Sequence, residues 1–260
     1  MQAFAYAKPG SLADAARAAG MVDAKLMAGG QSLLAAMKLG LAAPQSVVDL
    51  GGLAELKGIT VSGGTVRIGA LTTHAAVAAS KEVAAAIPVL AALAGGIGDR
   101  QVRNRGTIGG SLANNDPAAD YPAAALGLGA TIHTDRRAIA ADDFFTGLYE
   151  TALAEGEIIT AVSFPVPEKA GWQKFKQPAS RFALVGVFVS KGSQGVRVAV
   201  TGAGPGVFRA KALEVKLAAG WSGAQCDGVK IDASNLNTDL HGSAEYRAAL
   251  IPVLAKRAVG

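Results

Sequence analysis

The spacing of hydrophobic residues changes twice along the chain and predicts three parts. In the first part, helical spacing and short apolar runs predict two helices and two strands, over residues 11–20, 32–39, 25–28 and 46–50. Ser11 is a favourable helix N-cap and Gly20 a favourable helix end. This order of helix, strand, glycine turn, helix and strand indicates a small α/β unit.

Strand and helix patterns mix in the second part, which begins at residue 58. Period-2 and apolar runs predict strands over 59–62, 65–69, 129–134 and 158–164, and helical spacing predicts helices over 72–79 and 82–94. Gly63 and Gly64 separate the first two strands and predict a hairpin. The polar residues 98–105 predict a loop, and residues 114–122 predict a turn-rich stretch.

The third part follows a proline-rich boundary at residues 165–171. Two β-branched runs, 182–190 and 195–201, predict an antiparallel pair, and helices are predicted over 209–219 and 243–258. The patterns together predict an α+β protein. Its first domain covers 1–170, with two α/β subdomains of about 1–57 and 58–170, and a smaller α+β domain with an antiparallel sheet and helices covers 171–260.

Composition excludes several classes of protein. Half of the residues are hydrophobic, which excludes a disordered chain, and the single cysteine, Cys226, excludes a disulfide or a cysteine-bound cluster within this chain. The net charge of +5 is spread out, and the basic run 100–105 has no interleaved aromatic residue, so nucleic-acid binding is not expected. No stretch predicts a transmembrane helix. The first ten residues lack the pattern of a secretory signal, which predicts a cytoplasmic protein unless a signal-bearing partner carries it across a membrane.

Two glycine pairs are the main candidates for a binding site. In Leu26–Leu33, a strand runs into Gly29 and Gly30, and polar residues then open a helix. Successive N–H groups at such a turn can converge on a diphosphate, although a plain tight turn has the same pattern. In Thr107–Ser111, hydroxyl groups flank Gly109 and Gly110, and Asn and Asp side chains suited to sugar hydroxyls follow, although a capped surface turn looks similar. A dinucleotide-like diphosphate held between the two loops would explain both.

No other residues predict chemistry on this chain. His74, His133 and His241 have no partner at metal-ligand spacing, so no metal site is expected. The chain has no convincing nucleophile–base pair, and no catalytic residue is predicted.

The glycine segments closely resemble those of the flavin-binding subunit of the molybdenum hydroxylases. The string GDRQVRNRGTIGGSLANNDPAADYP carries the most specific likeness, AGGQSLLAAMKLGL is similar to the family's first FAD loop, and HGSAEYRAALIPVLAKRAV is similar to its C-terminal end. The family includes carbon monoxide dehydrogenase medium chains and the flavin portion of xanthine dehydrogenases. The resemblance implies an FAD-binding domain of the vanillyl-alcohol-oxidase/PCMH type over 1–170 and a C-terminal domain of the CO dehydrogenase flavoprotein type over 171–260.

The resemblance also implies which residues bind FAD. It assigns the diphosphate to the two loops, a cofactor-contacting carboxylate to Asp120, an apolar position beside the flavin ring to Ile159, a nearby cation to Lys176 and a ring-packing position to Ile97. The implied loop residues are Leu26, Met27, Ala28, Gly29, Gly30, Gln31, Ser32, Leu33, Thr107, Ile108, Gly109, Gly110 and Ser111.

The function implied by the resemblance is that of an FAD-bearing electron-transfer subunit in a heterooligomeric molybdenum hydroxylase. A large partner subunit would hold the molybdenum cofactor and a small one two [2Fe–2S] clusters, in a heterotrimer that pairs into a dimer of heterotrimers. One alternative is a stand-alone flavin oxidoreductase, for which the residues after Gly171 leave little room for a substrate domain. A second alternative is a scaffold subunit without flavin, against which the two intact glycine pairs count.

Overall fold

The computed structural model describes residues 1–260 and begins with a small parallel sheet. Its strand order is β1 (Ala5–Ala7), β3 (Ser46–Asp49) and β2 (Ala24–Met27). Helix α1 (Leu12–Ala19) connects β1 to β2, α2 (Leu33–Lys38) follows β2, and short 3₁₀ turns η1 (Leu50–Gly52) and η2 (Ala54–Leu56) follow β3. The Ser11 hydroxyl caps α1 by accepting from the Asp14 amide at 3.2 Å, as its position predicts. The predicted α/β unit is confirmed.

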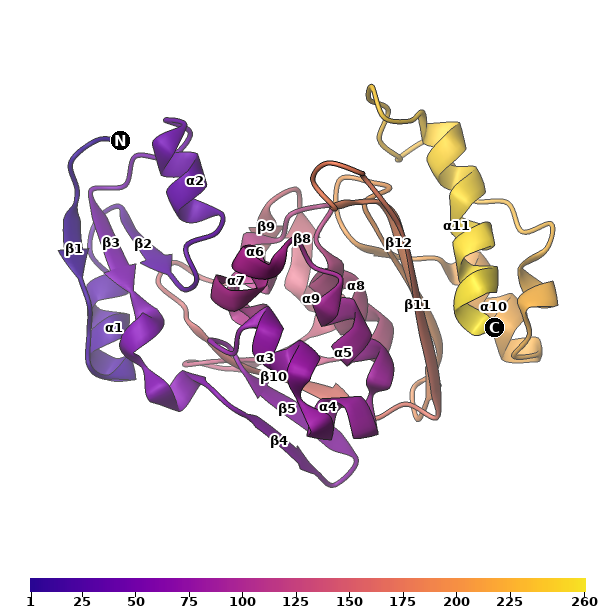
Figure 1. The fold of residues 1–260 in the computed structure, drawn as a ribbon, viewed down its shortest axis with the longest axis horizontal. Coiled ribbons are helices and arrows are strands. Elements are labelled where there is room, and N and C mark those ends of the chain that lie inside the picture. The colour runs from indigo at the N-terminus through magenta and orange to yellow at the C-terminus, as the bar shows by residue number, and fades with distance from the viewer.

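An antiparallel five-stranded sheet forms the base of the central unit (Figure 1). Its order is β4 (Ile59–Ser62), β5 (Thr65–Gly69), β10 (Ile159–Pro165), β6 (Thr131–Thr134) and β7 (Ala138–Ala140). Gly63 and Gly64 form the predicted hairpin turn, both with positive φ. The remaining central elements are α3 (His74–Ala79), α4 (Lys81–Ala86), α5 (Pro88–Gly95), α6 (Arg100–Arg105), α7 (Ile108–Asn114), α8 (Asp120–Leu128), α9 (Ala141–Phe144), β8 (Phe145–Gly147) and β9 (Glu150–Thr151).

In three segments of the central unit, the observed secondary structure differs from the predicted one. The single helix over 82–94 is two helices, because Pro88 starts a new one at its first position. The expected loop over 98–105 contains α6, whose N-cap Asp99 accepts from the Val102 amide at 2.8 Å. None of the α6 residues is buried, so no apolar periodicity marked this helix. The expected loop Thr107–Ser111 is the first turn of α7, with Thr107 as its N-cap.

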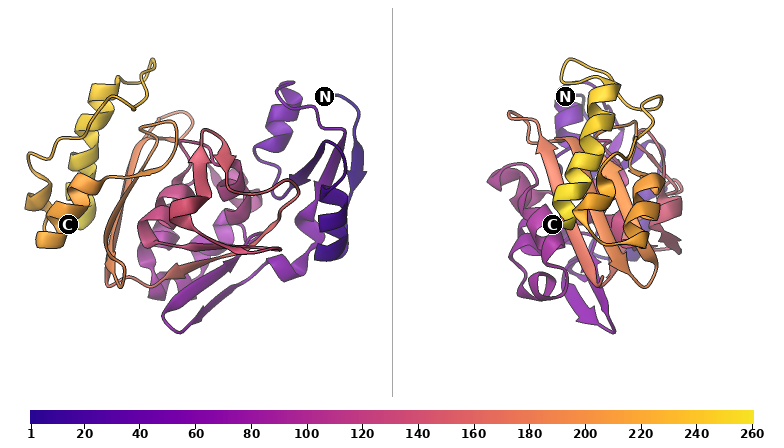
Figure 2. Two further views of the ribbon diagram at one scale, coloured as in Figure 1. Left: turned by 180° about the vertical axis from the view of Figure 1, so that it is seen from behind. Right: turned by 90° about the vertical axis from the view of Figure 1, so that its right-hand side faces the viewer.

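The C-terminal unit is an antiparallel sheet with helices on its outer face. Strands β11 (Lys169–Lys176), β12 (Ala183–Gly192), β13 (Gly195–Thr201) and β14 (Phe208–Arg209) pair in this order, and α10 (Lys211–Ala219), the 3₁₀ turn η3 (Gly223–Cys226) and α11 (Ala244–Val259) follow. Seen from behind, the sheet stands between the central helices and the C-terminal helices (Figure 2). The predicted antiparallel pair and the two helices are confirmed.

Both faces of β12 are covered, which explains its long apolar run. Phe188 packs into the core of the central unit, whereas Val185, Val187 and Val189 pack under α10 and α11. Gly127 in α8 lies against Phe188, where a β-carbon would come within 2.6 Å of the ring. The C-terminal sheet is therefore packed directly on the helix that begins at Asp120. None of the helices is both long and apolar enough to span a lipid bilayer.

Candidate functional site

A cavity of about 1210 Å³ opens between the three units, and both glycine segments line it. The N-terminal and C-terminal units lie on opposite sides of the central one, and α6 and α7 lie between them (Figure 1). The lining comes from the β2–α2 turn, α6 and α7, the start of α8, the segment before β10, and the β11–β12 connection. A cavity of this volume can hold an extended cofactor.

The two glycine segments are in direct contact. A β-carbon on Gly29 would overlap the main-chain carbonyl of Arg105, just before α7. Gly109 also packs closely, against Ala70, where a β-carbon would come within 2.6 Å of the Ala70 β-carbon. Of the two pairs, only Gly30 has a positive φ, of +75°. Glycine is therefore required for two reasons: close packing at Gly29 and Gly109, and a left-handed backbone conformation at Gly30.

The backbone amides of the two segments differ. The N–H groups of residues 28–33 donate no hydrogen bond to any protein atom, and all of these residues line the cavity. By contrast, the amides of residues 108–111 are all paired, with Thr72, Ala70 and the side chain and carbonyl of Thr107 as acceptors. Six consecutive unpaired amides at a strand-to-helix turn form an anion cradle. Thr107–Ser111 therefore supplies a wall and hydroxyl groups, and not the second set of free amides that its glycines suggested.

A carboxylate of the central unit and a lysine of the C-terminal unit meet at the cavity. Asp120, the first residue of α8, is only 4% exposed, and its Oδ2 accepts from Lys174 Nζ of β11 at 2.6 Å. Burial disfavours the charged carboxylate and raises the pKa of Asp120 to about 6, although Lys174 opposes this shift. The other oxygen, Oδ1, is buried without a hydrogen-bond partner. An unpaired acceptor of this kind fits a ligand hydroxyl.

His74 presents a second unpaired atom on the cavity lining. Its Nδ1 is buried without a partner, and the ring lies 5.3 Å from that of Tyr121. Burial lowers the pKa of His74 to about 4, and the nearby charge of Arg103 acts in the same direction. His74 is therefore a neutral hydrogen-bonding group at neutral pH.

Most of the residues implied by the resemblance come together here. All of Leu26–Leu33 line the cavity, as do the four residues Thr107, Gly109, Gly110 and Ser111, and also Ile97, Asp120 and Ile159. Ile108 instead lies in the core of the central unit, fully buried. Lys176 is exposed and does not line the cavity. Lys176 is the last residue of β11, two positions beyond Lys174, where the pairing with β12 becomes irregular.

Sequence reasoning missed several lining residues. Neither Lys174 nor His74 lies in a recognisable sequence motif. Their roles in the site depend on the groups that face them in the folded chain. Tyr149 and Arg181 line the cavity with φ of +56° and +63°, unusual for residues with side chains. Tyr149 lies at the tip of the β8–β9 hairpin, with its hydroxyl 3.4 Å from Asp116 Oδ2. Only the structure reveals this backbone conformation.

The fold and the site together define a flavoprotein with a two-part FAD-binding domain and a C-terminal α+β domain. The free amides fit a diphosphate, and the unpaired Asp120 Oδ1 fits a hydroxyl of the chain that joins a diphosphate to a ring. The chain belongs to the family described as the FAD binding domain in molybdopterin dehydrogenase, which its residues 2–167 match. The predicted family and FAD cofactor are confirmed.

Similarity to known proteins extends over the whole chain. The sequence is 36% identical to the nicotine 6-hydroxylase medium subunit of Paenarthrobacter nicotinovorans, with 100% of this chain and 97% of that protein covered. It is 35% identical to the carbon monoxide dehydrogenase medium chain of Hydrogenophaga pseudoflava, with 98% and 96% covered. A chain of the reconstituted CO dehydrogenase structure from Oligotropha carboxidovorans superposes with a TM-score of 0.90 at 32% identity, covering 99% of this chain and 96% of that one.

Proposed function

We propose that this chain is the FAD-bearing electron-transfer subunit of a molybdenum hydroxylase. In this proposal, a large partner subunit holds the molybdenum cofactor, and a small one holds two [2Fe–2S] clusters that deliver electrons to the FAD site. The observation that carries the proposal is the row of unpaired amides from Ala28 to Leu33 in a cavity shared by three units. FAD bound there would supply a carrier that accepts electrons from one partner and passes them to an external acceptor.

The residues of this chain would bind and orient the cofactor. The amides of residues 28–33 would hold the diphosphate, with Ser111 and Thr107 on the facing wall. Asp120 Oδ1 would accept a hydrogen bond from a cofactor hydroxyl, while Lys174 keeps the carboxylate in place. Ile97 and Phe182 would cover an apolar ring. No residue of this chain would act as a nucleophile or as a base on the substrate.

Partner subunits are part of the proposal. The relatives include a protein named as a medium subunit and another named as a medium chain, which supports a complex with large and small subunits. We propose a heterotrimer that pairs into a dimer of heterotrimers, as closed symmetry favours, and a cytoplasmic location for it.

Spectroscopy and native mass measurement test this function. The full chain, purified with co-expressed partners, should show flavin absorption bands, release FAD on denaturation and have the mass of a multi-subunit complex. A flavin-free chain would overturn the proposal in favour of a scaffold subunit. A flavin-bound chain that stays alone when its partners are co-expressed would favour a stand-alone flavin oxidoreductase.

A further inference from the structure

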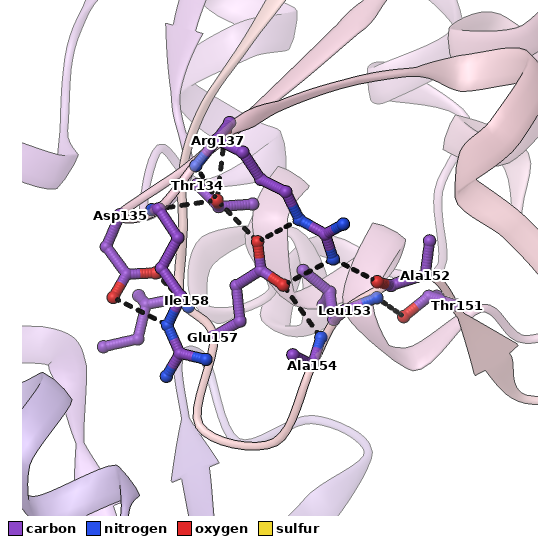
Figure 3. Close-up of polar contacts among 10 residues, drawn as sticks. Thr134, Asp135, Arg137, Thr151, Ala152, Leu153, Ala154, Glu157 and Ile158 are labelled. Carbon is purple, nitrogen blue, oxygen red and sulfur yellow. Dashed lines mark hydrogen bonds and ion pairs between the residues drawn. The ribbon is translucent and has the colours of Figure 1, made fainter.

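The segment before β10 is held by an ion pair between the buried Glu157 and the half-exposed Arg137. The side chain of Glu157 is fully buried, and its carboxylate accepts four hydrogen bonds (Figure 3). Arg137 donates two of them, from Nε and Nη2, each at 2.9 Å. The Thr134 hydroxyl donates at 2.7 Å and the Ala154 amide at 2.8 Å. These contacts hold the pKa of Glu157 down at about 2, chiefly through Arg137.

The same turn fastens the segment at two further points. Arg137 Nη2 also donates to the Ala152 carbonyl at 2.6 Å. At the other end, the Ile158 amide donates to Asp135 Oδ1 at 2.8 Å, and the Ile158 carbonyl accepts from the Asp135 amide at 2.9 Å. Residues 152–158 are therefore tied along their length to the β6–β7 turn, residues 134–137.

This segment forms one wall of the cavity. Leu153, Glu157, Ile158 and Ile159 all line it. Both oxygens of Glu157 already accept two hydrogen bonds each, so its carboxylate has no remaining capacity for a ligand. Its effect on a bound molecule must pass through the apolar neighbours that it holds in place.

Those neighbours lie at the end of the cavity next to the N-terminal unit. Ile158 packs in one cluster with Leu50 and Leu71, which also line the cavity. The C-terminal unit, on the opposite side of the central unit (Figure 1), contributes the cations Lys174 and Arg181 to the lining, and the N-terminal unit contributes one cation, the exposed Lys25 of β2. Beside residues 153–159, the packed lining side chains Leu50, Leu71 and Ile158 are apolar, so this part of the wall offers an apolar surface, whereas the lining at the C-terminal unit carries two cations.

We propose that the Arg137–Glu157 pair is a positioning device for the adenine end of FAD and thereby sets the preference for FAD over FMN. The proposal rests on the proposed function, because it takes FAD as the occupant of the cavity. Charged groups near a flavin ring shift its reduction potential, so we place the ring near Lys174. The flat adenine base has no such requirement and can pack against the apolar side chains at Ile158. Ile159 then lies near the base and not, as the resemblance implied, beside the flavin ring.

The test compares the affinities of FAD, ADP and FMN for the full chain freed of flavin. Arg137→Met should weaken FAD and ADP by about tenfold or more and leave FMN within about twofold. Arg137→Lys, which keeps the charge but not the paired hydrogen bonds, should recover part of the loss. Lys256→Met is the matched control, because Lys256 is equally exposed at 50% and pairs with Asp227 far from the cavity. It should change none of the three affinities.

Each other outcome has a definite meaning. Equal losses for FMN and FAD in the Arg137 variants would overturn the proposal, because the pair would then support the whole cavity. Unchanged affinities for all three ligands would overturn it as well. If Arg137→Met does not fold, the same three affinities are measured for Arg137→Lys, with a smaller expected loss for FAD and ADP. A parent chain that binds no FAD would instead refute the proposed function.

Discussion

Gly29 lies so close to the main-chain carbonyl of Arg105 that no β-carbon fits between them. This contact joins the turn after β2 to the C-terminal end of α6, although the two are far apart in sequence. It fixes the direction in which the unpaired amides of residues 28–33 face. The first glycine of the cradle is therefore required by packing between two units, and the second, Gly30, by its positive φ.

Gly29→Ala should destabilise the fold as well as cofactor binding. The added methyl group has only rigid backbone to displace, and overpacking of this kind costs about 1–3 kcal/mol. Thermal unfolding of the flavin-free chain should show the loss. Gly10→Ala is the matched control, because Gly10 has open space around it and, like Gly29, no positive φ. A similar loss in both variants would contradict the role of the contact with Arg105.

Gly110→Val should remove tight FAD binding and leave the fold intact. A β-carbon at Gly110 would lie 3.0 Å from Thr107 Oγ1 and 3.5 Å from Ala28, so the valine methyl groups would extend between the two segments. The φ of Gly110 is helical, and steric bulk is the cause that we expect, without backbone strain. Flavin stoichiometry by absorbance and far-UV circular dichroism measure the two effects. Full flavin occupancy would show that this wall does not contact the cofactor.

The contribution of Asp120 to the stability of the flavin-free chain should fall as pH rises from about 4 to about 6, whereas that of His74, whose pKa burial lowers from 6.5 to about 4, should rise over the same range. Burial raises the pKa of Asp120 from 3.8 to about 6, so in this range the folded state binds more protons than the unfolded state. The contribution is roughly 3 kcal/mol at most. The Asp120→Asn variant isolates the effect of Asp120, because both chains keep His74: in urea unfolding, the parent chain should lose stability relative to this variant between pH 4 and pH 7. An unchanged slope would mean that Asp120 ionises normally in the folded chain.

Lys174→Met should lower the flavin reduction potential more than Lys176→Met does. A cation near the ring favours its reduced, anionic form, and removing Lys174 also leaves Asp120 unpaired. We expect a decrease of about 30 mV or more for Lys174→Met, which corresponds to roughly 1.4 kcal/mol for a two-electron couple. Redox titration of the flavin-loaded chain gives both values. A larger effect from Lys176 would restore the role that the resemblance implied for it.

Local sequence patterns were sufficient for the N-terminal unit, for the main hairpins and for the glycine segments, but not for α6, α7, α8 or β11. The strand, glycine pair and helix of residues 24–38, the hairpin at Gly63–Gly64 and the pair β12 and β13 all follow from short-range periodicity and turn chemistry. The free amides of residues 28–33 follow in the same way, because a chain that leaves a strand through Gly30 and enters a helix has no local partners for them.

Tertiary structure decided which side chains and amides face the cavity. The amides of Ile108 and Gly109 are occupied because Thr72 and Ala70 lie next to them, and the packing of the C-terminal sheet on α8 brings Lys174, and not Lys176, to Asp120. The Arg137–Glu157 pair likewise joins the β6–β7 turn to the segment before β10, 20 residues away in sequence. Sequence alone predicts local backbone states well, since these depend on neighbouring residues. Which groups remain free to bind depends on contacts between distant segments, and these exist only once the three units have packed together.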